Sequence, residues 1–293
     1  MSPLPPPISL VLSTYQSQAH IGAALRSALA QDYSPLEILI ADDGSTDETV
    51  AIVERELGAY CGPHTVILDP ARDHLGVEHA NRWIRQIRGQ LVVRAAGDAV
   101  SRPDRVRRTV EVWQSAKVSL VAAPVKAAPA GPVAIDQLLA ETVALESDES
   151  TFAYEPEVLT RPGPLSTRHH RFGSGPLLLF RACLMKGVYC LAEPLVERLA
   201  PAGPSQPPAS PAADPSIALE TQRAAAAAIA VRRLEELFEL KAAGLVETHS
   251  TRAQILLQRR ILATARDWVD ARRKLMSQNL RPIWVEPAPP VKP

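Results

Sequence analysis

The sequence predicts an α/β fold in which a mainly parallel sheet carries helices on both faces. Through residues 1–125, short apolar runs alternate five times with stretches of helical periodicity. This alternation is typical of parallel strands joined by crossover helices. Hydrophobic residues make up 46% of the 293 residues, enough for a buried core, and only 4% are aromatic, so aliphatic side chains must fill most of it.

Five strands are expected from the apolar runs, which are short and end at turn-forming residues. They span residues 8–13, 36–41, 65–68, 90–93 and 118–122. The apolar spacing between them predicts a helix from 21 to about 31–32, one that begins after a cap at Ser45 or Thr46, one over 76–87 and one over 103–116. Pro103 suits a first helical turn, where no N–H partner is lost.

Beyond residue 125 the pattern is weaker. We expect a helix over 135–146, an irregular connection containing prolines as far as 171, a helix over 177–185 and a strand over 188–191. Residues 201–215 have the composition of a proline-rich linker. Residues 216–286 carry apolar stripes at helical spacing and predict a C-terminal helical extension, followed by a mobile tail over 287–293.

Charge and cysteine content exclude several classes of protein. Lys and Arg together number 32, as do Asp and Glu, so no bulk basic field points to nucleic acid as a partner. Three cysteines without CxxC spacing argue against a zinc ribbon or a disulfide framework and fit a reducing compartment. With neither a signal peptide nor an apolar run of about 18 residues, the expectation is a cytoplasmic protein without a transmembrane segment.

Several short motifs follow one another in the first 110 residues. They are Ser13-Thr14-Tyr15, residues 27–33, residues 37–47, residues 76–81 and Pro103-Asp104-Arg105. Together they closely resemble family 2 glycosyltransferases of the GT-A fold, a Rossmann-like fold. The resemblance covers residues 8–110 well and residues 177–198 faintly. It implies that residues 1–125 bind a nucleotide-sugar donor and that residues 126–200 form the acceptor-side half.

The resemblance also implies a nucleotide-binding site made of Thr14, Tyr15, Asn81 and one of the two acids Asp42 and Asp43. Thr14 and Tyr15 would line the nucleoside pocket, one acid would accept from the base, and Asn81 would lie at the edge of the donor site. Carboxylates at the ends of parallel strands lie where ligands bind in open α/β sheets. The residues alone also allow a plainer interpretation, in which one acid caps a turn, the other faces solvent, and Asn81 bonds a neighbouring loop.

The metal-binding motif of the family is incomplete in this chain. Members carry a DxD-type motif after the fourth strand, and it helps to hold a divalent cation on the donor diphosphate. In the matching stretch the first acid is replaced by Ala96, a frequently acidic later position is Ala99, and Asp98 alone remains. Asp98 is therefore the expected ligand of a weakly held Mg²⁺ or Mn²⁺, an ion that often keeps several waters.

The catalytic base of the family is also missing from its usual place. Inverting members carry an acidic pair before a helix that residues 178–187 resemble, and one carboxylate deprotonates the acceptor. Here Ser174 and Gly175 stand at those positions, and Leu199-Ala200-Pro201 replaces a short Arg-x-His segment. One of several nearby acids is a candidate for a displaced base. The pair His169-His170 either contacts the diphosphate or belongs to a solvated loop. These acids are Glu141, Glu146, Asp148, Glu149, Glu155 and Glu157.

Two functions follow from these observations. The first is an inverting glycosyltransferase of hexosyltransferase type, which moves a sugar from a nucleotide-diphosphate donor to a glycan or lipid-linked acceptor in bacterial cell-surface polysaccharide biosynthesis. The alternative is a catalytically inactive GT-A protein that acts as a scaffold, a partner subunit or a nucleotide-sugar sensor. The C-terminal helices would then dock a protein partner, and their basic residues form either a solvated face or a peripheral contact with the inner membrane.

Overall fold

A computed structural model describes residues 4–124, 126–127, 129–140, 149–161, 165, 174–199, 237 and 258. Its centre is an eight-stranded sheet of order β3-β2-β1-β4-β8-β6-β9-β7. The first four of these strands in space are parallel, whereas β8 runs antiparallel to both of its neighbours. The strands are β1 (Ile8–Thr14), β2 (Leu36–Asp42), β3 (Thr65–Pro70), β4 (Leu91–Ala96), β6 (Leu120–Ala122), β7 (Gly131–Val133), β8 (Phe152–Tyr154) and β9 (Val188–Cys190).

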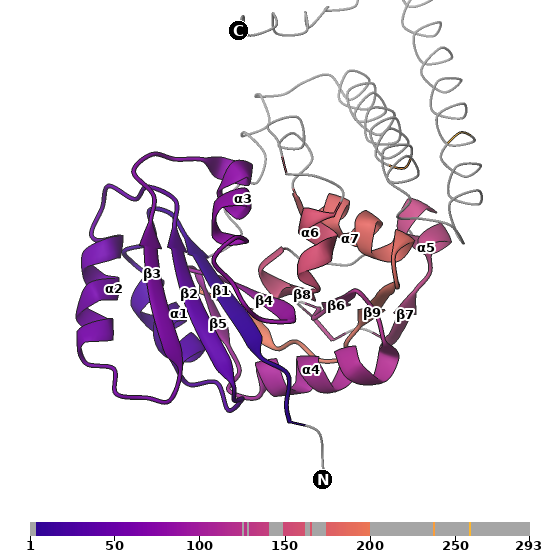
Figure 1. The fold of residues 1–293 in the computed structure, drawn as a ribbon, viewed down its shortest axis with the longest axis horizontal. Coiled ribbons are helices and arrows are strands. Elements are labelled where there is room, and N and C mark those ends of the chain that lie inside the picture. The colour runs from indigo at the N-terminus through magenta and orange to yellow at the C-terminus, as the bar shows by residue number, and fades with distance from the viewer. Residues whose placement is uncertain are drawn as a thin grey trace, which may run out of the picture.

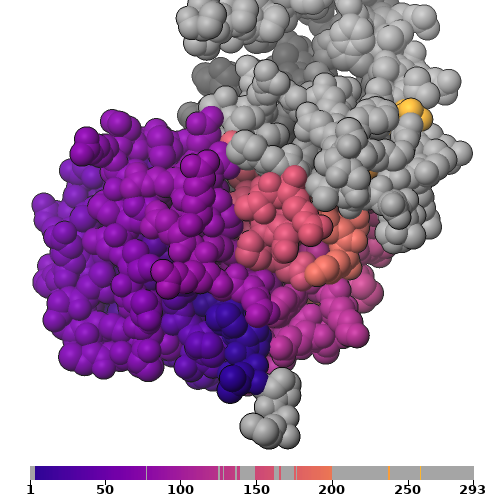
Figure 2. Space-filling model, viewed as in Figure 1, coloured from indigo at the N-terminus to yellow at the C-terminus, as the bar shows by residue number. Residues whose placement is uncertain are grey.

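Helices cover both faces of the sheet (Figure 1). One buried cluster joins the sheet to α1 (Ile21–Leu29), α2 (Thr49–Gly58) and α4 (Arg105–Ala116). The cluster on the other face joins it to α3 (His79–Trp83), α5 (Ile135–Ala140), α6 (Pro156–Thr160) and α7 (Ser174–Leu184). In the space-filling view the N-terminal part of the chain forms one continuous body, and the segment around α6 and α7 packs along its side (Figure 2).

Alternation along the strands assigns their side chains to the two faces. In β1, Leu10 and Leu12 join the cluster under α1, while Val11 joins the cluster under α7. In β4, Val92 belongs to the α7 face and Val93 to the α1 face. Because successive strand residues point to opposite faces, Arg94 lies on the same face as Val92, beside α3. A charged residue thus occupies an otherwise apolar strand.

The sheet and most of its elements confirm the α/β prediction, with four corrections. The helix expected over 76–87 is only a 3₁₀ turn at Gly76–Glu78 followed by α3, which ends at Trp83. Neither Ser45 nor Thr46 caps α2, which begins at Thr49. The helix expected from Pro103 begins at Arg105. The connection expected to be irregular contains η2 (Glu149–Thr151), β8 and α6.

A small second sheet was not predicted. β5 (Ala99–Ser101) pairs antiparallel with β10 (Val196–Arg198), so the chain that follows Asp98 lies beside a segment almost one hundred residues later. The helix expected over 135–146 is present as far as Ala140. Residues 141–148, the His169-His170 pair, the linker over 201–215 and the tail over 287–293 lie outside the described residues, as does the helical extension over 216–286 apart from residues 237 and 258.

Candidate functional site

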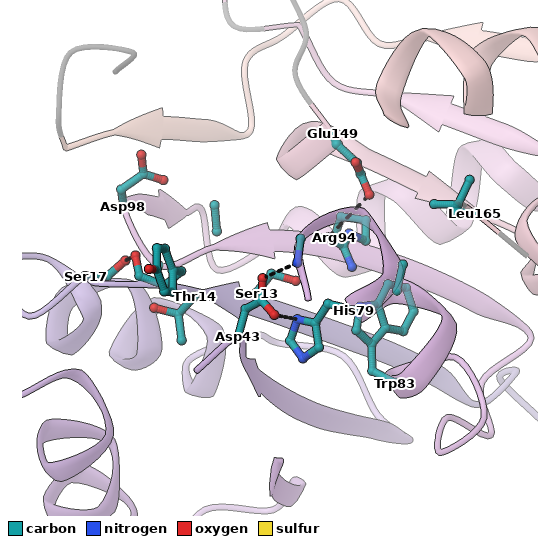
Figure 3. Close-up of a pocket in the computed structure, with 15 residues that line it drawn as sticks. Ser13, Thr14, Ser17, Asp43, His79, Trp83, Arg94, Asp98, Glu149 and Leu165 are labelled. Carbon is teal, nitrogen blue, oxygen red and sulfur yellow. Dashed lines mark hydrogen bonds and ion pairs between the residues drawn. The ribbon is translucent and has the colours of Figure 1, made fainter. Parts of the chain in front are cut away.

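A cavity of about 310 Å³ opens where the neighbouring strands β2, β1 and β4 end. This is the edge of the sheet at which open α/β folds bind ligands. Three of the residues expected at a nucleotide site, Thr14, Tyr15 and Asp43, line it together with Asp98 (Figure 3). The full lining is Ser13, Thr14, Tyr15, Ser17, Asp43, Gly76, His79, Ala80, Trp83, Arg94, Ala96, Gly97, Asp98, Glu149 and Leu165.

The two neighbouring acids have different surroundings. Asp42 is 1% exposed and closes its own turn, because its carboxylate accepts from Ser45 N at 2.9 Å and from Ser45 Oγ at 2.5 Å. Asp43 turns to the cavity and accepts from Leu75 N at 2.8 Å and Gly76 N at 2.9 Å. Of the two acids, Asp43 is therefore the one placed where a ligand would meet it, and Asp42 has the turn-capping geometry.

Gly44 makes this turn possible. Its φ is +80°, a conformation that side chains rarely adopt, and an added Cβ would lie 2.8 Å from the carbonyl carbon of Asp73. The backbone N–H of Asp43 donates to Thr14 O at 2.9 Å, which fixes the end of β2 against the end of β1. The turn therefore holds Asp43 in one position relative to Thr14.

Tyr15 and Thr14 contribute an exposed ring and a buried hydroxyl. Tyr15 is 44% exposed, and its ring stacks on that of His74 with centroids 4.3 Å apart. Thr14 is 4% exposed, and among the described residues nothing pairs with its Oγ1. An aromatic ring beside an unpaired hydroxyl and a carboxylate suits a nucleoside, which needs a stacking surface and polar partners.

Asn81 does not line the cavity. Its Nδ2 donates to Leu165 O at 2.6 Å, and its Oδ1 accepts from Leu165 N at 2.8 Å. This two-way pairing matches the plainer interpretation of the residue, a helix-face amide that bonds a neighbouring loop. Because Leu165 itself lines the cavity, Asn81 positions part of the wall.

Asp98 lies at the cavity but is already paired. Its Oδ2 accepts from Arg198 Nη2 at 3.0 Å, which bridges the start of β5 to the end of β10. In the described part of the chain, no three His, Cys, Asp or Glu side chains gather to hold a metal ion. One carboxylate bound to a guanidinium is a poor donor set for Mg²⁺ or Mn²⁺, which bind several oxygens. Asp98 as a metal ligand stays a prediction, and no chemical step below depends on it.

Ser174 and Gly175 form the first turn of α7, so no acid is present at the start of this helix. A Cβ added at Gly175 would lie 3.5 Å from the Phe152 ring and 3.8 Å from the backbone nitrogen of Glu149. Glu149 thus lies against Gly175, one of the two positions at which the resemblance implies an acidic pair. Its side chain is 22% exposed and lines the cavity.

The other described acids of that segment lie away from the cavity lining. Glu155 is 6% exposed, and its carboxylate accepts from Lys186 Nζ at 2.7 Å and Ser119 Oγ at 3.1 Å, so its role is structural. Glu157 is exposed in the first turn of α6, where a negative charge favours the helix. Among the described members of the six candidate acids, Glu149 is therefore the one at the cavity.

Sequence reasoning missed Arg94, His79 and Trp83, which form the inner end of the cavity. The guanidinium carbon of Arg94 lies 4.6 Å from the centre of the Trp83 ring, and its Nη2 lies 3.4 Å from Glu149 Oε1. The His79 side chain is 6% exposed, and burial lowers the pKa of its imidazole, which therefore stays neutral at pH 7. A charged residue inside an apolar strand was the available signal for Arg94.

Comparison with known proteins agrees with this geometry. The sequence model of Glycosyl transferase family 2 matches residues 9–173, more than half of the chain. The chain therefore belongs to this family. An uncharacterized glycosyltransferase of Nostoc sp. is 24% identical over 204 residues, 64% of this chain and 63% of that protein. The succinoglycan biosynthesis protein ExoO of Rhizobium meliloti is 34% identical over 108 residues, 36% of this chain and 29% of ExoO. The chain thus spans less than two thirds of the length of both relatives.

Solved structures confirm the GT-A fold. TarS of S. aureus in complex with UDP-GlcNAc matches with a TM-score of 0.57 at 15% identity, over 94% of this chain and 76% of that chain. The mannosyltransferase PcManGT of Pyrobaculum calidifontis in complex with GDP-Man and Mn²⁺ matches with a TM-score of 0.51 at 18% identity, over 94% of this chain and 79% of that chain. No helix in the described part of this chain is both long and apolar enough to cross a membrane.

Proposed function

We propose that this protein binds a nucleotide-diphosphate sugar in the cavity and transfers the sugar to an acceptor hydroxyl with inversion. The observation that carries the proposal is the meeting of Tyr15, Thr14, Asp43 and Asp98 in one cavity at the strand ends of a family 2 fold. Tyr15 offers a face for the base, and Asp43 offers a carboxylate to the base or ribose. The UDP-GlcNAc and GDP-Man held by the two structural neighbours support this class of donor.

We assign the catalytic base to Glu149. In an inverting transfer, the acceptor oxygen forms a bond to the anomeric carbon, the bond from that carbon to the diphosphate breaks, and the hydroxyl proton moves to a carboxylate. Glu149 lines the cavity and lies beside Gly175, at the start of the helix where the family places its acids. Its side chain is partly exposed, so an acceptor can reach it.

The acceptor is a glycan or a lipid-linked sugar in this proposal. Support comes from the relatives: ExoO is a succinoglycan biosynthesis protein, and a chondroitin synthase of Escherichia coli is 29% identical over 109 residues. The same relatives favour a role in cell-surface polysaccharide biosynthesis. A cytoplasmic location, peripheral contact with the inner membrane and docking of a protein partner through the C-terminal helices stay predictions.

The test is turnover with donor panels of UDP- and GDP-sugars, measured as release of UDP or GDP. Wild-type protein should release nucleotide faster when an acceptor is present. Glu149→Gln should lose at least about 100-fold in kcat while still binding nucleotide, because general base catalysis contributes factors of this order. Glu157→Gln removes an exposed acid of the same segment and is the matched control, expected to turn over normally.

A second function is favoured by a specific observation, the loss of acids at Ala96, Ser174 and Gly175 combined with the Asp98–Arg198 pair. A protein with this site could bind a nucleotide sugar as a sensor or serve as a scaffold, without catalysis. Nucleotide binding without turnover on any donor and acceptor would favour the sensor. Absence of binding to UDP and GDP would favour the scaffold.

A further inference from the structure

The inner end of the cavity contains a buried cation with unused hydrogen-bond donors. The Arg94 side chain is 10% exposed and lines the cavity. Within the described part of the chain, no hydrogen-bond partner meets its Nε or Nη1. Burying guanidinium N–H groups without acceptors costs free energy, so such groups are expected to meet an acceptor in the working protein.

Other buried polar atoms of the cavity also lack a hydrogen-bond partner within the described residues. Ser13 Oγ and His79 Nε2 are buried and lack a hydrogen-bond partner among the residues described. Ala80 and Ala96 also line the cavity and contribute only methyl groups. The described lining thus combines further polar atoms with the carboxylates of Asp43, Asp98 and Glu149, and Arg94 is the side chain in it whose positive charge would attract an anionic group.

The position of Arg94 separates it from Asp98, the residue expected beside the donor diphosphate. In Figure 3, Arg94 lies toward Glu149 and Leu165, whereas Asp98 and Ser17 lie at the other end of the cavity. Arg94 is fixed there by the Trp83 ring below it and by its place in a central strand. A planar guanidinium held in one orientation recognises carboxylate and phosphate oxygens in pairs.

We propose that Arg94 is a binding subsite for a carboxylate or phosphate group on the sugar or acceptor, distinct from the donor diphosphate. The substrate is then an acidic sugar or a phosphorylated acceptor. Glu149 competes with that group, because its Oε1 already lies 3.4 Å from Arg94 Nη2. Binding of the anionic group would release Glu149 from Arg94 toward the acceptor hydroxyl. This inference rests on the proposed function for the identity of the whole substrate.

The experiment compares acidic and neutral ligands that are otherwise matched, by titration calorimetry. UDP-glucuronate against UDP-glucose and GDP-mannuronate against GDP-mannose test a carboxylate on the donor. Glucuronate and glucose 6-phosphate against glucose, each with and without saturating UDP or GDP, test an anionic acceptor. The proposal expects the acidic ligand to bind at least about tenfold more tightly in one of these arms, as expected of a charge-assisted pair.

Two variants move this preference in opposite directions. Arg94→Gln should reduce the ratio of acidic to neutral affinity to within about twofold, and Glu149→Gln should raise it at least about threefold by removing the competing carboxylate. If Arg94→Gln does not fold, the result for Glu149→Gln decides. A purely structural arginine would lower stability in Arg94→Gln and leave the ratio unchanged.

The outcomes separate this proposal from the proposed function. Nucleotide binding with equal affinity for acidic and neutral ligands in every arm would overturn the subsite and leave glycosyl transfer standing. A preference that survives Arg94→Gln would also overturn it. If neither UDP nor GDP binds, the donor site fails, and the titrations of glucuronate and glucose 6-phosphate without nucleotide still decide whether Arg94 binds an anion.

Discussion

Asp98 and Arg198 form an ion pair across two segments that are far apart in the sequence, with Asp98 Oδ2 3.0 Å from Arg198 Nη2. The pair joins the strand β5 to the strand β10 at the edge of the cavity. The acid for which the sequence predicts a role as metal ligand is thus paired with a guanidinium in this chain.

The first prediction concerns metal dependence. Adding saturating Mn²⁺ to the wild-type protein should strengthen UDP or GDP binding by no more than about threefold over binding in EDTA, because the remaining carboxylate is held by Arg198. Arg198→Ala should increase the effect of Mn²⁺ to about fivefold or more by releasing Asp98. Calorimetric titrations measure both. An enhancement above tenfold in the wild type, lost in Asp98→Asn, would show that Asp98 binds the metal despite the pair.

The second prediction separates the two adjacent acids. Asp43→Asn should weaken nucleotide binding at least about tenfold more than Asp42→Asn does, because only Asp43 lines the cavity and orders Leu75 and Gly76. Asp42→Asn should instead lower the free energy of unfolding by about 1 kcal/mol, as its carboxylate accepts two bonds from Ser45. Equal losses of affinity in both variants would contradict this division of roles.

The sequence was informative where one local pattern determines one structure. The apolar runs predicted the parallel strands, and the family motifs predicted that Thr14, Tyr15 and an acid after β2 come together. Which acid faces the cavity could not be read, since Asp42 and Asp43 are neighbours at a strand end. Their roles depend on the position of the loop around Leu75, whose backbone N–H donates to Asp43. That contact joins segments distant in the sequence and forms only in the folded chain.

Other features depend on contacts between distant segments. β8 is three residues long and is a strand because β4 and β6 flank it, so its own residues gave little signal. Glu149 was one of six candidate acids, and the approach of α7 distinguishes it. Arg94 was the signal that sequence reasoning passed over, since a charge inside an apolar strand covered on both faces requires a partner.

The third prediction tests the close approach of two strand ends. A Cβ at Gly97 would lie 2.5 Å from Thr14 Oγ1 and 3.1 Å from Ser17 Oγ. Gly97→Ala should therefore push Thr14 from its place and weaken nucleotide binding at least about tenfold. Gly58→Ala is the matched control, because nothing lies within 4 Å of its added Cβ. Calorimetry with UDP and GDP measures both variants, and unchanged affinity in Gly97→Ala would refute the contact.

The fourth prediction concerns Arg105, which connects three segments of the chain: β4, β5 and η2. This side chain is 1% exposed and donates to Arg94 O at 2.6 Å, Ser150 O at 2.8 Å and Ser101 Oγ at 2.9 Å. It therefore holds in place the two backbone segments that carry Arg94 and Glu149. Arg105→Met should lower the free energy of unfolding by about 2–4 kcal/mol, since it leaves buried carbonyls without donors. The exposed Arg107→Met on the same helix, measured in the same urea titrations, should change the free energy of unfolding far less.

The last prediction follows from the buried imidazole of His79. Burial lowers its pKa below the ordinary 6.5, and nearby Arg94 and Arg82 lower it further, against the opposing effect of Asp43 and Asp69. As pH falls through 6.5, His79 takes up a proton in the unfolded chain but not in the folded protein. Its contribution to the free energy of unfolding is therefore complete above pH 6.5 and declines below it, by at most about 1.4 kcal/mol per pH unit. His79→Gln removes this titration. Urea unfolding at pH 7.5 and pH 5.5 should show a smaller loss of stability in the variant than in the wild type. Equal losses would mean that His79 takes up a proton in the folded protein as readily as in the unfolded chain.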